Sequence, residues 1–140
     1  MADLAKQALT GTDAKVFLDG EELGTWTNIE ATVTINYEDV QIGYDVKRHP
    51  VSWQGDGSIS WQATNSITAN IFNKLRNNKN ATFTIEAEIT QPSTGLTQME
   101  TLNDVTFDSL PLSTWAKGEL VANELSFRFA PSEVVFPQTI

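Results

Sequence analysis

The sequence predicts a mainly β fold with a single packed helix and a long loop between two of its strands. Three observations carry this prediction. Polar and apolar residues alternate with period two in at least four segments, as they do in strands with one buried face and one polar face. Turn-forming residues separate these segments, and only one stretch of the chain has apolar residues at helical spacing.

The alternation is clearest between Asn28 and Tyr37, where five apolar residues share one face and polar residues share the other. Two further segments follow the same pattern from 57 to 64 and from 82 to 90, and another runs from 121 to 129. The apolar faces therefore supply the predicted core. Its members are Ile29, Ala31, Val33, Ile35, Tyr37, Ile59, Trp61, Ala63, Phe83, Ile85, Ala87, Ile89, Val121, Leu125, Phe127 and Phe129.

Turns and one helix complete the predicted elements. Asp19-Gly20 predicts a hairpin turn within 14–23, because glycine tolerates a positive φ, and 92–95 reads Pro-Ser-Thr-Gly, another turn. A helix is predicted over 67–76, where Ile67, Ile71 and Leu75 recur every four residues and Ser66 can cap the first free amides.

Length and composition limit the function. The 140 residues, 40% of them hydrophobic, fit one domain spanning 1–140. The formal net charge is −9, which disfavours specific binding to phosphate backbones. Cysteine is absent, which excludes disulfides and thiolate chemistry. Neither a membrane-spanning run nor a secretory signal is recognisable, so we expect synthesis in the cytoplasm.

The residue types needed for catalysis do not gather in the sequence. Glu86 and Glu88 lie two apart on one strand face, but nothing identifies a cleft or raises one pKa, as a glycosidase pair requires. His49 is the sole histidine, which excludes a histidine-rich zinc site. Asp19, Glu21 and Glu22 lack the spacing of an EF-hand. We expect no enzyme activity, no cofactor, no metal and no small-molecule substrate.

The segment from Asp39 to Gln54 interrupts the strand pattern and is predicted to be a long loop. Its apolar content is too high for a freely solvated loop, so it either folds back as an extra hairpin or docks onto another molecule. We expect contact with another subunit. The residues assigned to that contact are Val40, Ile42, Tyr44, Val46, Lys47, Arg48, Val51 and Trp53.

The tryptophans raise an alternative function. A monomeric carbohydrate-binding β-module could stack sugars on exposed aromatic rings. Trp61 lies on an apolar strand face and is predicted to be core, whereas Trp53 and Trp115 lie near turns. Buried anchors at a subunit interface would explain these two positions equally well.

Several segments, taken in order, resemble the tail-tube proteins of contractile-tailed phages, defective-prophage elements and R-type bacteriocin particles. They are 11–13, the Leu-Asp-Gly-Glu-Glu hairpin at 18–22, the long strand from Ile29 to Tyr37, Gly-Asp-Gly at 55–57 before a strand and a helix, and the run from Leu102 to Ser109. The resemblance covers nearly the whole chain.

The resemblance implies a small antiparallel β-sandwich or barrel with one flanking helix, assembled as homo-hexameric rings that stack into a hollow tube. Residues 1–13 would form an N-terminal arm, and 39–54 would reach neighbouring subunits or the next ring. The implied partners are the tail sheath, baseplate and tail terminator proteins. DNA would pass through without specific binding, or the tube of a bacteriocin-like particle would pierce a membrane after sheath contraction.

A channel wall follows from this resemblance as a hypothesis. Thr32 and Thr34 on one strand, with Glu86 and Glu88 on another, are expected to face the lumen. Their hydroxyls and carboxylates would not hold DNA phosphates, so passage would not stall on the wall.

Overall fold

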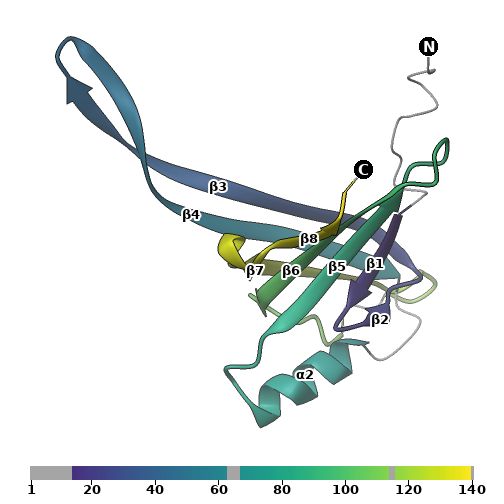
Figure 1. Cartoon of the computed structure of the whole chain (residues 1–140). Helices are drawn as coiled ribbons and strands as arrows, with labels where there is room; N and C mark the ends of the chain where they lie inside the picture. Colours follow the sequence, from purple (N-terminus) through teal and green to yellow (C-terminus); the bar gives the residue numbers. More distant parts are fainter. Residues whose placement is uncertain (1–13, 63–66, 114–115, 140) are drawn as a thin grey trace.

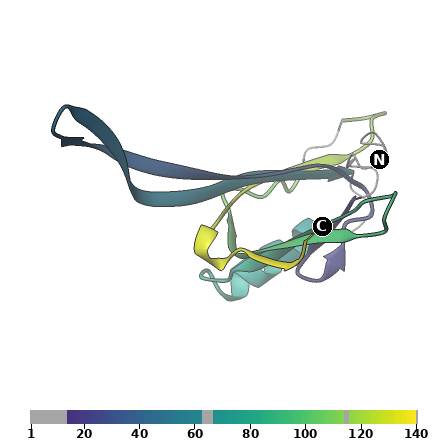
Figure 2. The same cartoon turned by 45° about the horizontal axis from the view of Figure 1, so that its top comes forward.

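A computed structural model describes residues 14–62, 67–113 and 116–139. The strands form two facing layers, and a helix covers one end of the space between them (Figures 1 and 2). In chain order the elements are β1 (Ala14–Leu18), β2 (Glu21–Glu22), β3 (Trp26–Ile42), β4 (Asp45–Gln62), α2 (Ile67–Asn77), β5 (Phe83–Thr90), β6 (Thr97–Phe107), β7 (Ala122–Phe129), a 3-10 turn (Pro131–Glu133) and β8 (Val135–Gln138).

The two layers belong to one folded sheet. Strands follow one another in the order β2-β1-β5-β6-β7-β4-β3, all antiparallel, with β8 added beside β6. Most of β6 pairs with β5, but its last residues, Thr106 and Phe107, pair with β7 in the other layer. Asp104, just before this switch, has a φ of 54°, and a local irregularity of this kind bends a strand. The sheet thus forms an incomplete barrel with an open seam between its first strands and β3.

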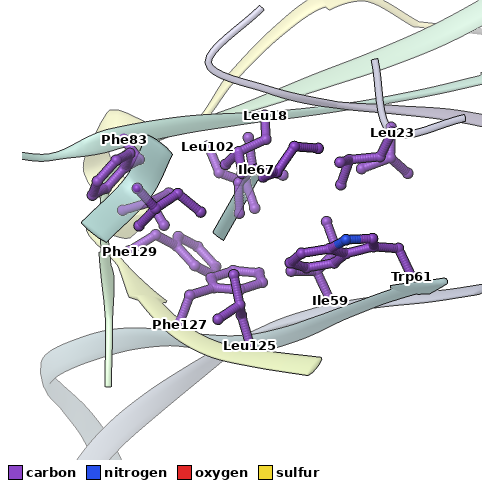
Figure 3. Close-up of a cluster of buried hydrophobic side chains, with 14 residues drawn as sticks. Leu18, Leu23, Ile59, Trp61, Ile67, Phe83, Leu102, Leu125, Phe127 and Phe129 are labelled. Atoms are coloured by element: carbon purple, nitrogen blue, oxygen red, sulfur yellow. The ribbon is translucent and has the colours of Figure 1, made fainter. Parts of the chain in front are cut away.

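The core fills the space between the layers. Ile59, Trp61, Leu125 and Phe127 rise from the layer of β4 and β7 toward Leu18, Leu23, Phe83 and Leu102 on the opposite side (Figure 3). Each of these side chains is almost fully buried. The predicted buried faces are confirmed at Ile59 and Trp61, at Phe83 and Ile85, and at Leu125, Phe127 and Phe129. The predicted core residues Ala87, Ile89 and Val121 are only half-buried, and Ala63 lies outside the described residues.

Helix α2 confirms the prediction of a helix over 67–76, and it closes one end of the core. Ile67 and Ile71 are buried and Leu75 packs against them. Near the C-terminal end, Lys74 Nζ lies 3.0 Å from Asp19 Oδ2 and donates to the Thr82 carbonyl at 2.9 Å. The other Asp19 oxygen accepts the Thr84 N–H at 2.8 Å, so the β1–β2 turn ties the helix to the sheet. The predicted cap, Ser66, lies outside the described residues.

The predicted turn between β1 and β2 is confirmed by its backbone. Asp19 and Gly20 have φ values of 50° and 84°, and a two-residue hairpin turn of type I′ requires a positive φ at both positions. Gly95, with a φ of 72°, occupies the predicted turn between β5 and β6.

Residues 39–54 are strand and not the predicted loop. They form the far end of the β3–β4 hairpin, with pairs running from Asn36↔Ser52 through Tyr37↔Pro50 to Ile42↔Asp45. Of the two alternatives, folding back as an extra hairpin is correct for the chain's own backbone. Pro50 interrupts the sequence pattern but sits beside the register shift at Asn36/Tyr37, where a missing amide donor is tolerated.

Gly57 permits the close packing of the hairpin on the core. A Cβ at this position would clash with the Glu30 carbonyl oxygen and with the Phe127 ring. Changing Gly57→Ala should lower the free energy of unfolding by about 1–3 kcal/mol, the usual cost of overpacking. Urea denaturation followed by circular dichroism measures this change.

The control for Gly57 is Gly24→Ala, because a Cβ at Gly24 meets open space. That variant should stay within about 0.5 kcal/mol of the parent protein. Equal stabilities for the two variants would contradict the packing described for Gly57.

Candidate assembly surfaces

The β3–β4 hairpin extends well past the barrel (Figures 1 and 2). Strand β7 covers β4 only from Gln62 to Gly55, where Gly55 pairs with Phe129. Beyond that pair, among the described residues, β3 and β4 pair only with each other. We call residues 34–54 the ribbon. An isolated two-stranded hairpin is marginally stable in water, so the ribbon is the part of the chain that most needs a partner.

One face of the ribbon is apolar and exposed. Ile35 lies opposite Trp53, and Tyr37 lies opposite Pro50. The exposed fractions are 44% for Ile35, 40% for Tyr37 and 53% for Trp53. Val33, at the base of the ribbon, is also exposed. A contiguous patch of this kind marks an interaction surface.

The inward packing predicted for this strand is correct only at its start. Ile29 packs against the core, whereas the predicted core residues Ala31, Val33, Ile35 and Tyr37 are exposed. The exposure of these residues could not be predicted from alternation, because the pattern is the same whether or not the chain itself covers the apolar face. The strand's length was the available signal, since it exceeds what one layer can cover.

The end of the ribbon adds more apolar side chains and two basic ones. Tyr44 at the turn is fully exposed, and the Arg48 guanidinium lies 3.9 Å from the centroid of the Tyr37 ring. Lys47 pairs in register with Val40, next to this cation–π contact. All eight residues predicted for the subunit interface lie on the ribbon: Val40, Ile42, Tyr44, Val46, Lys47, Arg48, Val51 and Trp53.

The other face of the hairpin is polar along the barrel and the start of the ribbon. Thr32 pairs with Asp56 and Thr34 with Gln54. Asn36 Nδ2 donates to Ser52 Oγ at 3.0 Å. This polar face continues across β7 through Glu124, Ser126 and Arg128, which pair with Ser60, Ser58 and Asp56.

The four residues predicted for the lumen do not share one surface. Thr32 and Thr34 lie on the outer face of the β3–β4–β7 layer, whereas Glu86 and Glu88 lie on the outer face of the opposite layer. The neighbours of the two glutamates fix this placement, because Ile85 in the same strand is fully buried on the inner face. The expectation that one channel wall contains all four residues is therefore wrong. A wall formed by the β3–β4–β7 layer would contain Thr32 and Thr34 but not Glu86 and Glu88.

The open seam of the barrel forms a groove of about 980 Å³. Apolar and charged residues both line it. The lining residues are Ala14, Lys15, Val16, Glu22, Leu23, Gly24, Trp26, Thr27, Asn28, Ile29, Ala87, Glu88, Ile89, Gln98 and Glu100.

Glu100 is an unusual member of this groove. It pairs in register with Ala87, and the next pair along the strands, Ile85↔Leu102, is part of the core. Glu100 therefore shares the inner face of its sheet. Burial raises the pKa of the Glu100 carboxyl above its usual range, because desolvation disfavours the charged form. No sequence pattern singled out this residue.

The tryptophans divide between core and surface. Trp61 is buried as predicted, Trp26 lines the groove and Trp53 is exposed on the ribbon. Trp115 lies outside the described residues. Within the described ranges, acidic and histidine side chains do not gather into a cluster that could hold a metal ion. The described helices include none that is long and apolar enough to span a membrane.

A relative with a known sequence matches almost the whole chain. The phage-like element PBSX protein XkdM of Bacillus subtilis (strain 168) is 28% identical over 139 residues, covering 96% of this chain and 95% of the relative.

Two solved structures share the fold. The chain matches a subunit of the sheath–tube complex of an extracellular contractile injection system, PVC, with a TM-score of 0.73 at 8% identity, covering 94% of this chain and 93% of that one. It matches a subunit of a gene transfer agent tail, refined with C6 symmetry, with a TM-score of 0.51 at 13% identity, covering 95% of this chain and all of that one.

The family model described as phage tail tube protein matches residues 3–135. This span takes in both layers, the helix, the groove and the entire ribbon. The chain belongs to the family of phage tail tube proteins.

Proposed function

We propose that this tail tube protein assembles into hexameric rings that stack into a hollow tube, with the ribbon as the assembly element and the polar face of β3, β4 and β7 as the channel wall. The observation that carries the proposal is the exposed apolar face of the ribbon. The C6 symmetry of the similar gene transfer agent tail supports a six-fold ring.

The ribbon supports assembly because its apolar face has no layer above it among the described residues. Ile35, Tyr37 and Trp53 would each gain from burial, at roughly 25 cal/mol for each Å² of apolar surface removed from water. Strand β3 is also the last strand of its sheet. A neighbouring copy that pairs with β3 removes the free edge that otherwise invites uncontrolled aggregation.

The polar face supports a channel wall that does not hold phosphates. Thr32 and Thr34 present hydroxyls, and the carboxylates of Glu30, Asp56 and Glu124 on the same face repel phosphates. Arg128 is the basic residue of this face, and its Nε lies 3.6 Å from Asp56 Oδ1 and 3.8 Å from Asp108 Oδ1. Because both carboxylates offset its charge, Arg128 offers little attraction to passing DNA.

Further partners follow from the proposed tube. The similar structures include a sheath–tube complex. We infer that the layer opposite β3, β4 and β7, whose outer face carries Glu86 and Glu88, faces a tail sheath protein. Baseplate and terminator proteins would close the two ends of the tube. Whether the particle carries DNA or acts as a bacteriocin, the same polar wall serves the channel.

Shortening the ribbon tests its role in assembly. Residues 37–51 are replaced by Asn-Gly, so that the paired residues Asn36 and Ser52 flank a two-residue hairpin turn. The shortened protein should keep the thermal unfolding temperature of its barrel and lose rod formation in negative-stain microscopy, because the core residues are untouched.

A milder pair of variants provides the matched control. Ile35→Ser with Trp53→Ser removes apolar side chains from the ribbon face, whereas Thr34→Ser with Gln54→Asn changes the adjacent pair on the polar face. We expect rods only from the second pair. Normal rods from the shortened protein would contradict the assembly role of the ribbon.

Gold labelling tests which face lines the channel. Thr34→Cys and Glu88→Cys each introduce a sole thiol, because the chain contains no cysteine. After assembly and reaction with a maleimide-gold reagent, gold should lie along the axis of Thr34→Cys rods and along the outer margin of Glu88→Cys rods. The reverse distribution would show that the opposite layer faces the lumen.

A further inference from the structure

We propose that Glu100 is a proton-dependent switch in the open seam: the seam stays closed while this carboxyl is protonated and opens to water when the carboxyl ionises. The inference concerns the single subunit and does not depend on the proposed tube. Three observations carry it: the inward position of Glu100, the lack of a cation beside it among the described residues, and the absence of strand pairing across the seam in the same part of the chain.

The strand register places Glu100 on the inner face of its layer. Glu100 pairs with Ala87, and Ala87 pairs with Val16, which is fully buried. Two residues further along β6, Leu102 is also buried in the core. Because side chains two apart in a strand point to the same side, Glu100 occupies a core-facing position.

The groove residues that share this inner face are apolar or uncharged. Trp26 and Ile29 of β3 line the groove and pack against the core. Ile89 and Gln98 form the next inner pair of β5 and β6. Glu100 itself is half-buried. Moving a carboxylate out of water costs more free energy than moving the neutral acid, so a closed seam favours the protonated form of Glu100.

The other charged residues that line the groove occupy outward-facing register positions. Lys15 pairs with Glu88, and Lys15 comes one residue before the buried Val16. Glu22 pairs with Phe17, which comes one residue after Val16. Because successive side chains of a strand point to opposite faces, the Lys15 ammonium starts on the other side of the sheet from the Glu100 carboxyl.

The remaining charged groups of the neighbouring strands also face away from Glu100. Glu30 lies on the polar outer face of β3, and Glu86 lies on the outer face of β5. Asp104 of β6 is exposed, and β8 (Val135–Gln138) contains no charged residue. Among the described residues, Glu100 thus has no cation on its own face. Burial raises the pKa of its carboxyl, because desolvation disfavours the charged form.

The seam can respond to this charge because strand pairing does not cross it. The path of paired strands ends on β2 on one side and on β3 on the other. Within the described ranges, the inner faces on the two sides of the seam therefore meet through side-chain packing and not through a ladder of backbone hydrogen bonds. Packing against an ionised Glu100 is less favourable than packing against the neutral acid, whereas an open seam lets water solvate the carboxylate.

The direction of the pH response follows from the raised pKa. The pKa of Glu100 in the folded chain lies above the value for an unfolded chain, which is about 4.3. Stability contributed by the packed neutral acid is fully present below the unfolded pKa, and it is lost as the pH rises through the folded pKa. Each unit by which the pKa is raised corresponds to a change of about tenfold in the equilibrium between the closed and the open seam.

Thiol accessibility tests the switch. The parent chain has no cysteine, so Ile89→Cys places a sole thiol on the inner face of the groove. Its rate of reaction with maleimide is measured from about pH 5 to about pH 8, with Glu100 present and with Glu100→Gln, whose amide stays neutral. The ratio of the two rates cancels the ionisation of the thiol. The ratio should rise with pH by up to about tenfold for each unit by which the pKa is raised.

The matched control is Glu86→Gln. Glu86 is also half-buried, but it lies on the outer face of β5 and does not line the groove. Ile89→Cys combined with Glu86→Gln should keep the rise in rate that Glu100 produces. A ratio that stays at one across the pH range would overturn the switch. An equal loss of the rise in the Glu86→Gln control would overturn it as well, because the response would then follow total charge.

Thermal unfolding without any cysteine gives a second readout. Glu100→Gln should match the unfolding temperature of the parent protein below about pH 4 and exceed it near pH 7, where the parent carries the ionised carboxyl. If Glu100→Gln is never the more stable protein, the neutral form is not favoured in the seam and the switch is refuted. Both measurements use the unassembled subunit, so failure of the protein to form rods would refute tube assembly and leave this inference standing.

Discussion

The constraint on which the structure depends is that β3 and β4 are longer than the core that covers them. Near the barrel, Ile29 packs on the core and Ile59 is part of it. The third strand of the layer ends at Phe129, opposite Gly55, and past this point the same alternation continues with no facing layer among the described residues. Apolar side chains on this face would belong to the core if they lay a few residues closer to the barrel. On the ribbon they are exposed to water. In the free subunit the barrel therefore has a packed core, whereas the apolar face of the ribbon is uncovered.

The open seam is the second consequence of building an incomplete barrel from one folded sheet. The sheet turns over within β6 and its path ends on β2 on one side and β3 on the other. The inner faces of these end strands stay partly accessible, which is why Trp26, Ile29 and Glu100 line a groove. A buried carboxyl in an apolar groove is costly without a cationic partner.

Charge is divided between the two outer faces of the molecule. The polar face of β3, β4 and β7 is rich in hydroxyls and amides, and its arginine is held between Asp56 and Asp108. Glu86 and Glu88 lie on the other layer. The face of β3, β4 and β7 also carries Glu30, Asp56 and Glu124 against Arg128. Both outer faces are therefore acidic, in line with the net charge of −9, and such a face repels phosphates.

Local chemistry was sufficient to predict much of the fold. Alternation identified the strands around Ile59, Ile85 and Phe127 and their buried faces, because side chains of a strand point to opposite sides in turn. Four-residue spacing identified the helix from Ile67, and Asp19-Gly20 identified the first hairpin, since a two-residue turn of this type needs positive φ. Composition alone also predicted that the apolar residues of 39–54 contact another subunit; the structure shows that these side chains are exposed, and the contact itself stays a prediction.

Only the tertiary structure decided which surfaces lie together. Residues 39–54 lack clean alternation, and they became strand because an equally long partner offered backbone hydrogen bonds in register. The separation of Thr32 and Thr34 from Glu86 and Glu88 depended on which layer each strand joined, and period two cannot specify a layer. The groove around Glu100 combines residues of β1, β2 and β3 with residues of β5 and β6, and the two sets are distant in the chain. The sequence by itself determined strands and faces, whereas long-range strand pairing determined where those faces point.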